Sequence, residues 1–245
     1  LLVVKDGESR ASLHRLLQLL LRSHQSPRAA SVAISSCVWA VLRLWRFEVN
    51  DSTTWGEAGA LVDHIKALAT HAAALGVCRL RVGALLTSAA HYLSVALSHF
   101  GEAQEALECA LAMIRAELQE RRAEGAAAGA EGAAEGAEAE AAATARFDHS
   151  ASAAAMRRMG QVLRYRGDLD GAAQWLNRAL SMERRMNSTS PGLAETLHEL
   201  GVLRARQGAA ESARDLLSEA LRIKVGLQRR RDSAGGADGA EATAE

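Results

Sequence analysis

The chain has 245 residues, of which 49% are hydrophobic, 4% are aromatic and two are proline, and its formal net charge is zero. This alanine-rich composition predicts a nearly all-helical protein, and the balanced charge argues against nucleic acid or an anionic membrane surface as a partner. Cys37, Cys78 and Cys109 form no CxxC pair and have no histidines at ligand spacing. We therefore expect reduced thiols in a cytoplasmic protein with neither a metal nor a cofactor.

The N-terminal residues predict a short β-hairpin followed by a helix. Leu1 to Val4 favours a strand, Asp6-Gly7 favours a turn, and residues 12–22 carry apolar side chains at helical spacing. The chain opens without a methionine, and no apolar run reaches the roughly 18 residues of a membrane-spanning helix. The given residues show no signal peptide, and we expect a fragment of a longer polypeptide that has no membrane as a partner.

His14, Arg15, Leu16 and Gln18 give residues 12–22 a resemblance to a known segment. The helix is similar to the end of the winged-helix segment that follows an NB-ARC nucleotide-binding domain in STAND-type signalling ATPases. This resemblance implies that residues 1–25 are a winged-helix remnant. An ordinary amphipathic helix with a surface histidine explains the same residues.

Residues 26–82 predict a helical hairpin that connects this segment to the rest of the chain. Ser26 can cap a helix that begins at Pro27 and runs to about Arg46, and a second helix ends near Gly76. The polar loop and the start of the second helix resemble the corresponding hairpin of the same STAND architecture. The residues that carry this resemblance are Asn50, Asp51, Thr54, Trp55, Leu61 and His64.

The chain then repeats a helical hairpin. Met159-Gly160 aligns with Leu200-Gly201, and 41 residues separate the two glycines. Glycine inside a helix costs about 1 kcal/mol relative to alanine, so we expect close packing between helices at these positions. The small residues predicted to allow this packing are Gly160, Ala172, Ala179, Gly201, Ala213 and Ala220.

This pattern resembles the tetratricopeptide repeat, and the long period resembles the variety found in kinesin light chains and nephrocystin-like proteins. The resemblance implies an all-α, right-handed superhelical solenoid of antiparallel helix hairpins over residues 83–227. We expect repeats at 87–120, 153–186 and 194–227. The first is degenerate, with Thr87 at its first position and Leu93, Gly101 and Ala106 at the repeat positions.

Two stretches are predicted to lie outside the packed repeats. Residues 123–145 contain only Ala, Gly, Glu and one Thr. We interpret this stretch as a low-complexity insertion, because its glycines disfavour a stable helix and it has no large apolar residue to pack. Residues 228–245 are expected to be a disordered tail with a similar composition.

The tetratricopeptide resemblance also implies where a partner would bind, because the first helix of each hairpin lines the concave face of the solenoid. We expect a mildly basic groove for a peptide that carries carboxylates. The alternative is that these residues are only the solvated face of those helices. The candidate residues are Arg157, Gln161, Arg164, Tyr165, Glu195, His198, Arg206 and His91, together with Ser88 and His99.

The sequence contains no phosphate loop, dinucleotide fingerprint, metalloprotease motif or nucleophile elbow. We therefore predict a non-catalytic module that binds a protein or peptide, as the sensing or scaffolding arm of a STAND-like ATPase. Such an arm would contact an upstream nucleotide-binding domain within the same polypeptide. One alternative is a cargo or assembly adaptor of the kinesin light chain type. Another is a transcriptional regulator that uses the winged-helix remnant on DNA.

Overall fold

A computed structural model of the chain describes residues 2–4, 11–13, 25–128, 135–186 and 189–241. At the N-terminus, β1 (Leu2–Val4) pairs antiparallel with β2 (Ala11–Leu13), and Leu2 lies opposite Leu13. The predicted helix therefore does not include its first two residues, which belong to β2. Residues 14–24, on which the winged-helix interpretation depends, lie outside the described part of the chain.

Residues 26–82, expected to form a connecting helical hairpin, contain α2 (Pro27–Leu44), a short 3₁₀ turn (Ser52–Thr54) and α3 (Trp55–Leu75), and the next helix already begins at Arg79. The Ser26 hydroxyl accepts a hydrogen bond from the backbone N–H of Ala29 at 3.2 Å, so serine caps the helix as expected. Gly76 ends α3 in the left-handed conformation, with a φ of 69°.

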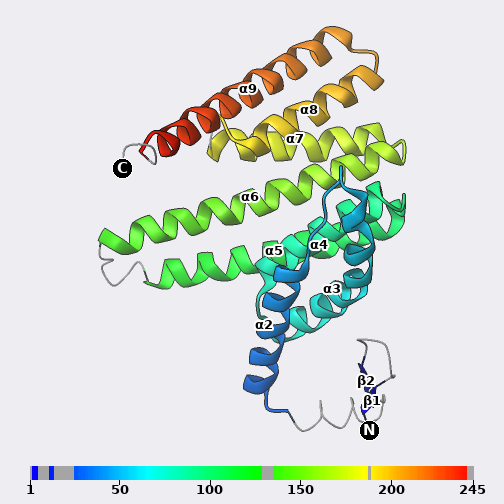
Figure 1. The fold of residues 1–245 in the computed structure, drawn as a ribbon, viewed down its shortest axis with the longest axis vertical. Coiled ribbons are helices and arrows are strands. Elements are labelled where there is room, and N and C mark those ends of the chain that lie inside the picture. Colours follow the sequence, from blue (N-terminus) through cyan, green and yellow to red (C-terminus); the bar gives the residue numbers. More distant parts are fainter. Residues whose placement is uncertain (1, 5–10, 14–24, 129–134, 187–188, 242–245) are drawn as a thin grey trace.

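Six further helices form three antiparallel hairpins that stack on one another (Figure 1). The first helices of successive hairpins also contact one another, α4 with α6 and α6 with α8. Apart from the β1–β2 pair, the described chain is therefore an all-α solenoid of tetratricopeptide-like hairpins, as predicted. The helices are α4 (Arg79–Val95), α5 (Phe100–Ala128), α6 (Glu135–Tyr165), α7 (Leu169–Met186), α8 (Pro191–Arg206) and α9 (Ala210–Glu241).

Small residues bring the two helices of each later hairpin together. A Cβ atom added to Gly160 would lie 2.6 Å from Leu176 Cγ, and one added to Gly201 would lie 2.7 Å from Leu217 Cγ. Ala172 and Ala179 are fully buried, and Ala213 and Ala220 nearly so. These contacts explain why glycine lies inside both helices.

The first repeat has a different register from the one expected. Its turn is at Ser98, whose φ of 56° matches the positive φ of Gly167 and Gly208 in the later turns. Gly101, expected to be the turn glycine, instead lies in the first turn of α5. Helix α5 consequently buries Ala103, Leu107 and Ala110 where the second repeat buries Ala172, Leu176 and Ala179.

The structure also differs from the predictions for the two low-complexity stretches. Helix α5 continues to Ala128 and α6 begins at Glu135, so much of the predicted insertion is helical. Helix α9 continues to Glu241 through most of the predicted tail. Alanine has the highest helix propensity, and a helix nucleated by packing can extend through neighbouring residues at low cost.

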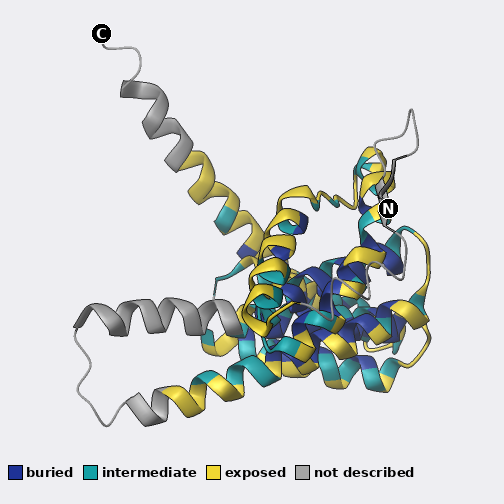
Figure 2. Cartoon of the chain, turned by 90° about the horizontal axis from the view of Figure 1, so that it is seen from below, coloured by how far each residue is buried: buried dark blue, intermediate teal, exposed yellow. Residues whose placement is uncertain are grey.

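Buried residues gather where the hairpins stack (Figure 2). One apolar cluster extends from Val38 in α2 to Leu203 in α8, and a smaller one around Leu193, Leu197 and Ile223 joins α8 to α9. Across the described residues, no helix combines the length and the apolar character needed to cross a membrane.

Candidate protein-binding surface

The predicted groove residues lie on the first helices of the three hairpins or at their ends, but they differ in exposure. Tyr165, Glu195, His198 and Arg206 are exposed, as is His99. Gln161, His91 and Ser88 are half-buried. Arg157 and Arg164, expected to offer free cations to a partner, are 7% and 5% exposed.

Arg157 joins the second and third repeats. Its guanidinium lies 3.2 Å from Glu183 Oε1 of α7 and 2.8 Å from Glu195 Oε2 of α8. The Ser190 hydroxyl donates a further hydrogen bond to Glu183 at 3.1 Å. Burial raises the pKa of Glu183, and the neighbouring Arg157 opposes that rise. Arg157 is therefore an internal contact between repeats rather than an open binding residue.

Arg164, about two helical turns further along α6, also joins the second and third repeats. Its Nη2 lies 3.0 Å from Glu199 Oε2 of α8, and Gln161 Nε2 donates to the other oxygen of Glu199 at 2.7 Å. Arg158 in turn donates to Gln161 Oε1 at 2.9 Å. Burial, followed by the charge of Arg157, lowers the pKa of Arg158 to about 10.

The charges along this interface offset one another. Three arginines of α6 face three glutamates, of which two are on α8, the helix that follows in the stack. The predicted basic groove is therefore largely neutral where the repeats meet. The three arginines lie on α6, but the glutamates that cover them come from other helices. The six residues are Arg157, Arg158, Arg164, Glu183, Glu195 and Glu199.

Tyr165 is the exposed aromatic residue of the predicted groove, at 42% relative accessibility. Its ring stacks on Phe100, with centroids 5.5 Å apart and an interplanar angle of 18°. The Arg164 guanidinium carbon lies 4.6 Å from the centroid of the Tyr165 ring. Tyr165 thus presents a ring that is held in place from two sides, where α5 begins and α6 ends.

His91 lies in an aromatic cluster that sequence analysis did not identify. Its ring makes an edge contact with Phe47 at 5.5 Å, and Phe47 also contacts Trp45 and Tyr92. Burial and the charges of Arg158 and Arg157 lower the pKa of His91 to about 3. His91 is therefore neutral near pH 7 and adds no positive charge. The cluster depends on the irregular segment after α2, which carries no periodic signal.

The residues of the Asn50 to Trp55 loop have structural roles. The Asp51 carboxylate accepts from the backbone N–H of Thr53 at 3.0 Å, and the Trp55 indole N–H donates to the Glu48 carbonyl at 3.0 Å. These hydrogen bonds fix the conformation of the loop that precedes α3. Within the described residues, no group of three or more His, Cys, Asp or Glu side chains has an arrangement suited to a metal ion.

Comparison with known proteins finds a family match for the later hairpins. Residues 150–224 match the family model described as tetratricopeptide repeat, which spans α7, α8 and parts of α6 and α9. No curated protein matches the chain. Among solved structures, the crystal structure of BtubC (BKLC) from P. vanneervenii is 16% identical, covers 87% of this chain and 79% of that chain, and has a TM-score of 0.49.

The family match indicates what kind of contact residues 150–224 are suited to make. Tetratricopeptide repeats generally mediate contacts between proteins. The second and third hairpins are similar to this family over that range, and their two glycine contacts and two glycine turns lie in matching positions.

Proposed function

We propose that this chain is a non-catalytic interaction module that binds a protein or peptide across the first helices of its repeats. The observation that carries the proposal is the exposed ring of Tyr165, held between Phe100 and Arg164. Large, rigid aromatic side chains provide much of the binding energy at protein interfaces, because they bury area with little loss of conformational entropy.

The exposed residues on this face favour a partner with both apolar and charged groups. Glu195 is anchored by Arg157 at 2.8 Å, yet 47% of its side chain remains accessible. His198 is also exposed on α8, and so is Arg206 at the end of this helix. The expected ligand is an extended or helical segment that places an apolar side chain on Tyr165 and a carboxylate near Arg206.

Site-specific photocrosslinking tests this surface. A photoreactive amino acid is placed at His198, and in a matched protein at Gln174 of α7, which is exposed on the second helix of a hairpin. A partner present in the source lysate should form an adduct with the first protein and not with the second. Adducts of equal yield at both positions, or at Gln174 alone, would contradict binding on the first helices.

Arg157 and Arg164 are unsuitable for testing binding, because their side chains are 8% and 6% exposed and paired across repeats. Substitution there is expected to disturb the stack itself. Tyr165→Ala is a better variant, since its ring is partly exposed and its removal leaves the buried ion pairs in place. We expect the His198 adduct to weaken in this variant while the helical content is retained.

We further propose that the module is the sensing or scaffolding arm of a STAND-like ATPase and works in the cytoplasm, in contact with a nucleotide-binding domain of the same polypeptide. The residues Asn50 to His64 and His14 to Gln18 support this, through their resemblance to that architecture. The 41-residue period instead supports a cargo adaptor of the kinesin light chain type. A phosphate-loop motif upstream in the full transcript would favour the ATPase, and a heptad coiled coil would favour the adaptor.

A further inference from the structure

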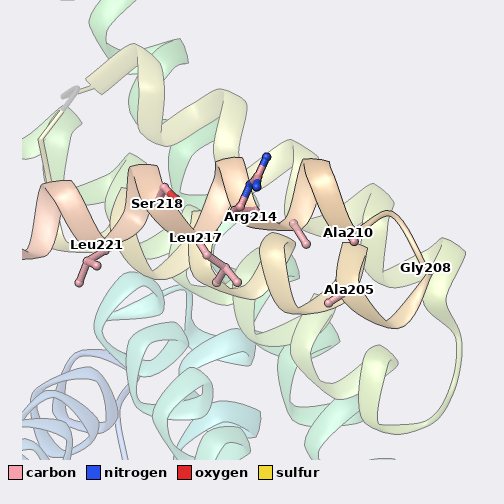
Figure 3. A pocket seen from close by; sticks show the side chains of 8 residues that line it. Ala205, Gly208, Ala210, Arg214, Leu217, Ser218 and Leu221 are labelled. Carbon is pink, nitrogen blue, oxygen red and sulfur yellow. The ribbon is translucent and has the colours of Figure 1, made fainter.

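The last hairpin has an open apolar hollow of about 470 Å³ between α8 and α9. It is lined by Ala205 of α8 and by Ala213, Leu217 and Leu221 of α9, with Arg214 and Ser218 at its polar part. In Figure 3 the side chains of Leu217 and Leu221 point to one side of α9, and those of Arg214 and Ser218 point to the other. The hollow is thus an apolar strip with a polar edge.

In the preceding repeat, the equivalent surface is covered by another helix. The 41-residue period makes Leu176 and Leu180 of α7 the counterparts of Leu217 and Leu221. Leu176 is fully buried, and Leu180 packs into both apolar clusters, because the next helix in the stack lies over them. Leu221, by contrast, is 62% exposed. The hollow is the place where one more helix would continue the solenoid.

A helix that covers this hollow must differ in charge from the helix that covers the preceding repeat. Arg214 stands where the covered repeat has Ala173, a small residue packed against the core. A helix that covered the hollow would bring Arg214 out of water, and this cation would then need a carboxylate partner. Further along α9, Arg222 and Lys224 are also exposed.

We infer that this hollow docks an amphipathic helix of a partner protein, with apolar side chains against Leu217 and Leu221 and a carboxylate opposite Arg214. A second copy of this chain fits less well, because two α9 helices placed face to face would bring Arg214 and Arg222 of one copy against those of the other. The surface is separate from the one centred on Tyr165, so either can operate without the other.

Fluorescence anisotropy with the full 245-residue chain tests the inference. The probes are a labelled 18-residue helical peptide of leucine, alanine and glutamate, and a matched peptide with lysine in place of every glutamate. We expect the acidic peptide to bind several-fold more tightly, and Arg214→Glu to reverse that preference. Leu221→Asn should weaken binding by about tenfold or more, because it removes the largest exposed apolar contact.

The matched control is Val32→Asn on α2, since Val32 has the same exposed fraction as Leu221, 62%. This variant should bind the acidic peptide as the unmodified chain does, and circular dichroism should show all variants folded. Equal binding of the two peptides, or equal loss in Val32→Asn and Leu221→Asn, would overturn the inference. A dimer in sedimentation that dissociates in Leu221→Asn would also overturn it, by showing that a second copy is the occupant.

Discussion

Gly160 of α6 and Leu176 of α7 are in such close contact that any side chain at position 160 would have to displace the leucine. An added Cβ would lie 2.6 Å from Leu176 Cγ and 3.1 Å from the Ala172 carbonyl oxygen. The carbonyl belongs to the backbone of α7 and cannot move aside without shifting the helix. This contact sets how closely the two helices of the second repeat approach, and Gly201 repeats it against Leu217.

Gly160→Ala is therefore expected to destabilise the chain despite the higher helix propensity of alanine. We expect a loss of about 1–3 kcal/mol in the free energy of unfolding, as for other overpacked helix contacts. The control is Gly226→Ala in α9, where nothing lies within 4 Å of an added Cβ. That substitution should stabilise by about 0.5–1 kcal/mol. Urea denaturation followed by circular dichroism measures both, and a stabilising Gly160→Ala would contradict the close approach.

Arg157→Met is expected to cost roughly 3 kcal/mol, because it leaves the buried carboxylate of Glu183 without its cation. The double variant Arg157→Met/Glu183→Leu should be more stable than the sum of the two single changes predicts, which a double-mutant cycle measures. Lys66→Met provides the surface control. Lys66 and Glu102 are 40% and 47% exposed, so its loss should cost at most about 1 kcal/mol. If Arg157→Met and Lys66→Met lowered the free energy of unfolding equally, the Arg157 ion pair would not be buried in solution.

His91 should make the stability of the chain depend on pH. Its pKa is lowered from 6.5 to about 3 by burial and by Arg158 and Arg157, so the unfolded state binds more protons than the folded state between these values. The contribution of neutral His91 is complete above pH 6.5 and is lost as the pH falls towards 3.

Comparison with His91→Gln isolates this effect, because glutamine does not titrate. Between pH 7 and pH 5 the unmodified chain should lose roughly 1 kcal/mol more stability than the variant, after allowance for the solvent that reaches the half-buried ring. The pKa of Glu183 is raised, which acts in the opposite direction, but this group is present in both proteins. Identical pH profiles would show that His91 is protonated as easily in the folded state as in the unfolded state.

The turn of the first repeat provides a test of its register. Ser98 has a φ of 56°, a conformation that is costly for a residue with a Cβ. Ser98→Gly should raise the stability by about 0.5 kcal/mol, after the larger entropy of unfolded glycine is subtracted. Gly208→Ala should instead lower it by about 1 kcal/mol, since Gly208 has a φ of 79°. Thermal unfolding compares the two, and destabilisation by Ser98→Gly would contradict a left-handed Ser98.

The local features of the fold were accessible from the sequence because they depend on neighbouring residues. The cap at Ser26, the stop at Gly76 and the turns at Gly167 and Gly208 each satisfy a backbone requirement within a few positions. The repeat of Gly160 at Gly201 similarly indicated two equivalent hairpins. The first repeat lacks these glycines at the equivalent places, and its register was predicted incorrectly.

The sequence by itself determined the caps, the glycine turns and the 41-residue period, since these follow from local backbone requirements and from spacing along the chain. Only the tertiary structure decided which of the candidate binding residues are available. Arg157 and Arg164 are covered because α8 brings Glu195 and Glu199 against them, about 35 residues further along the chain. Leu221 remains exposed because no helix lies over it in the described chain. Burial depends on which helices meet in space, and spacing within one helix does not carry that information.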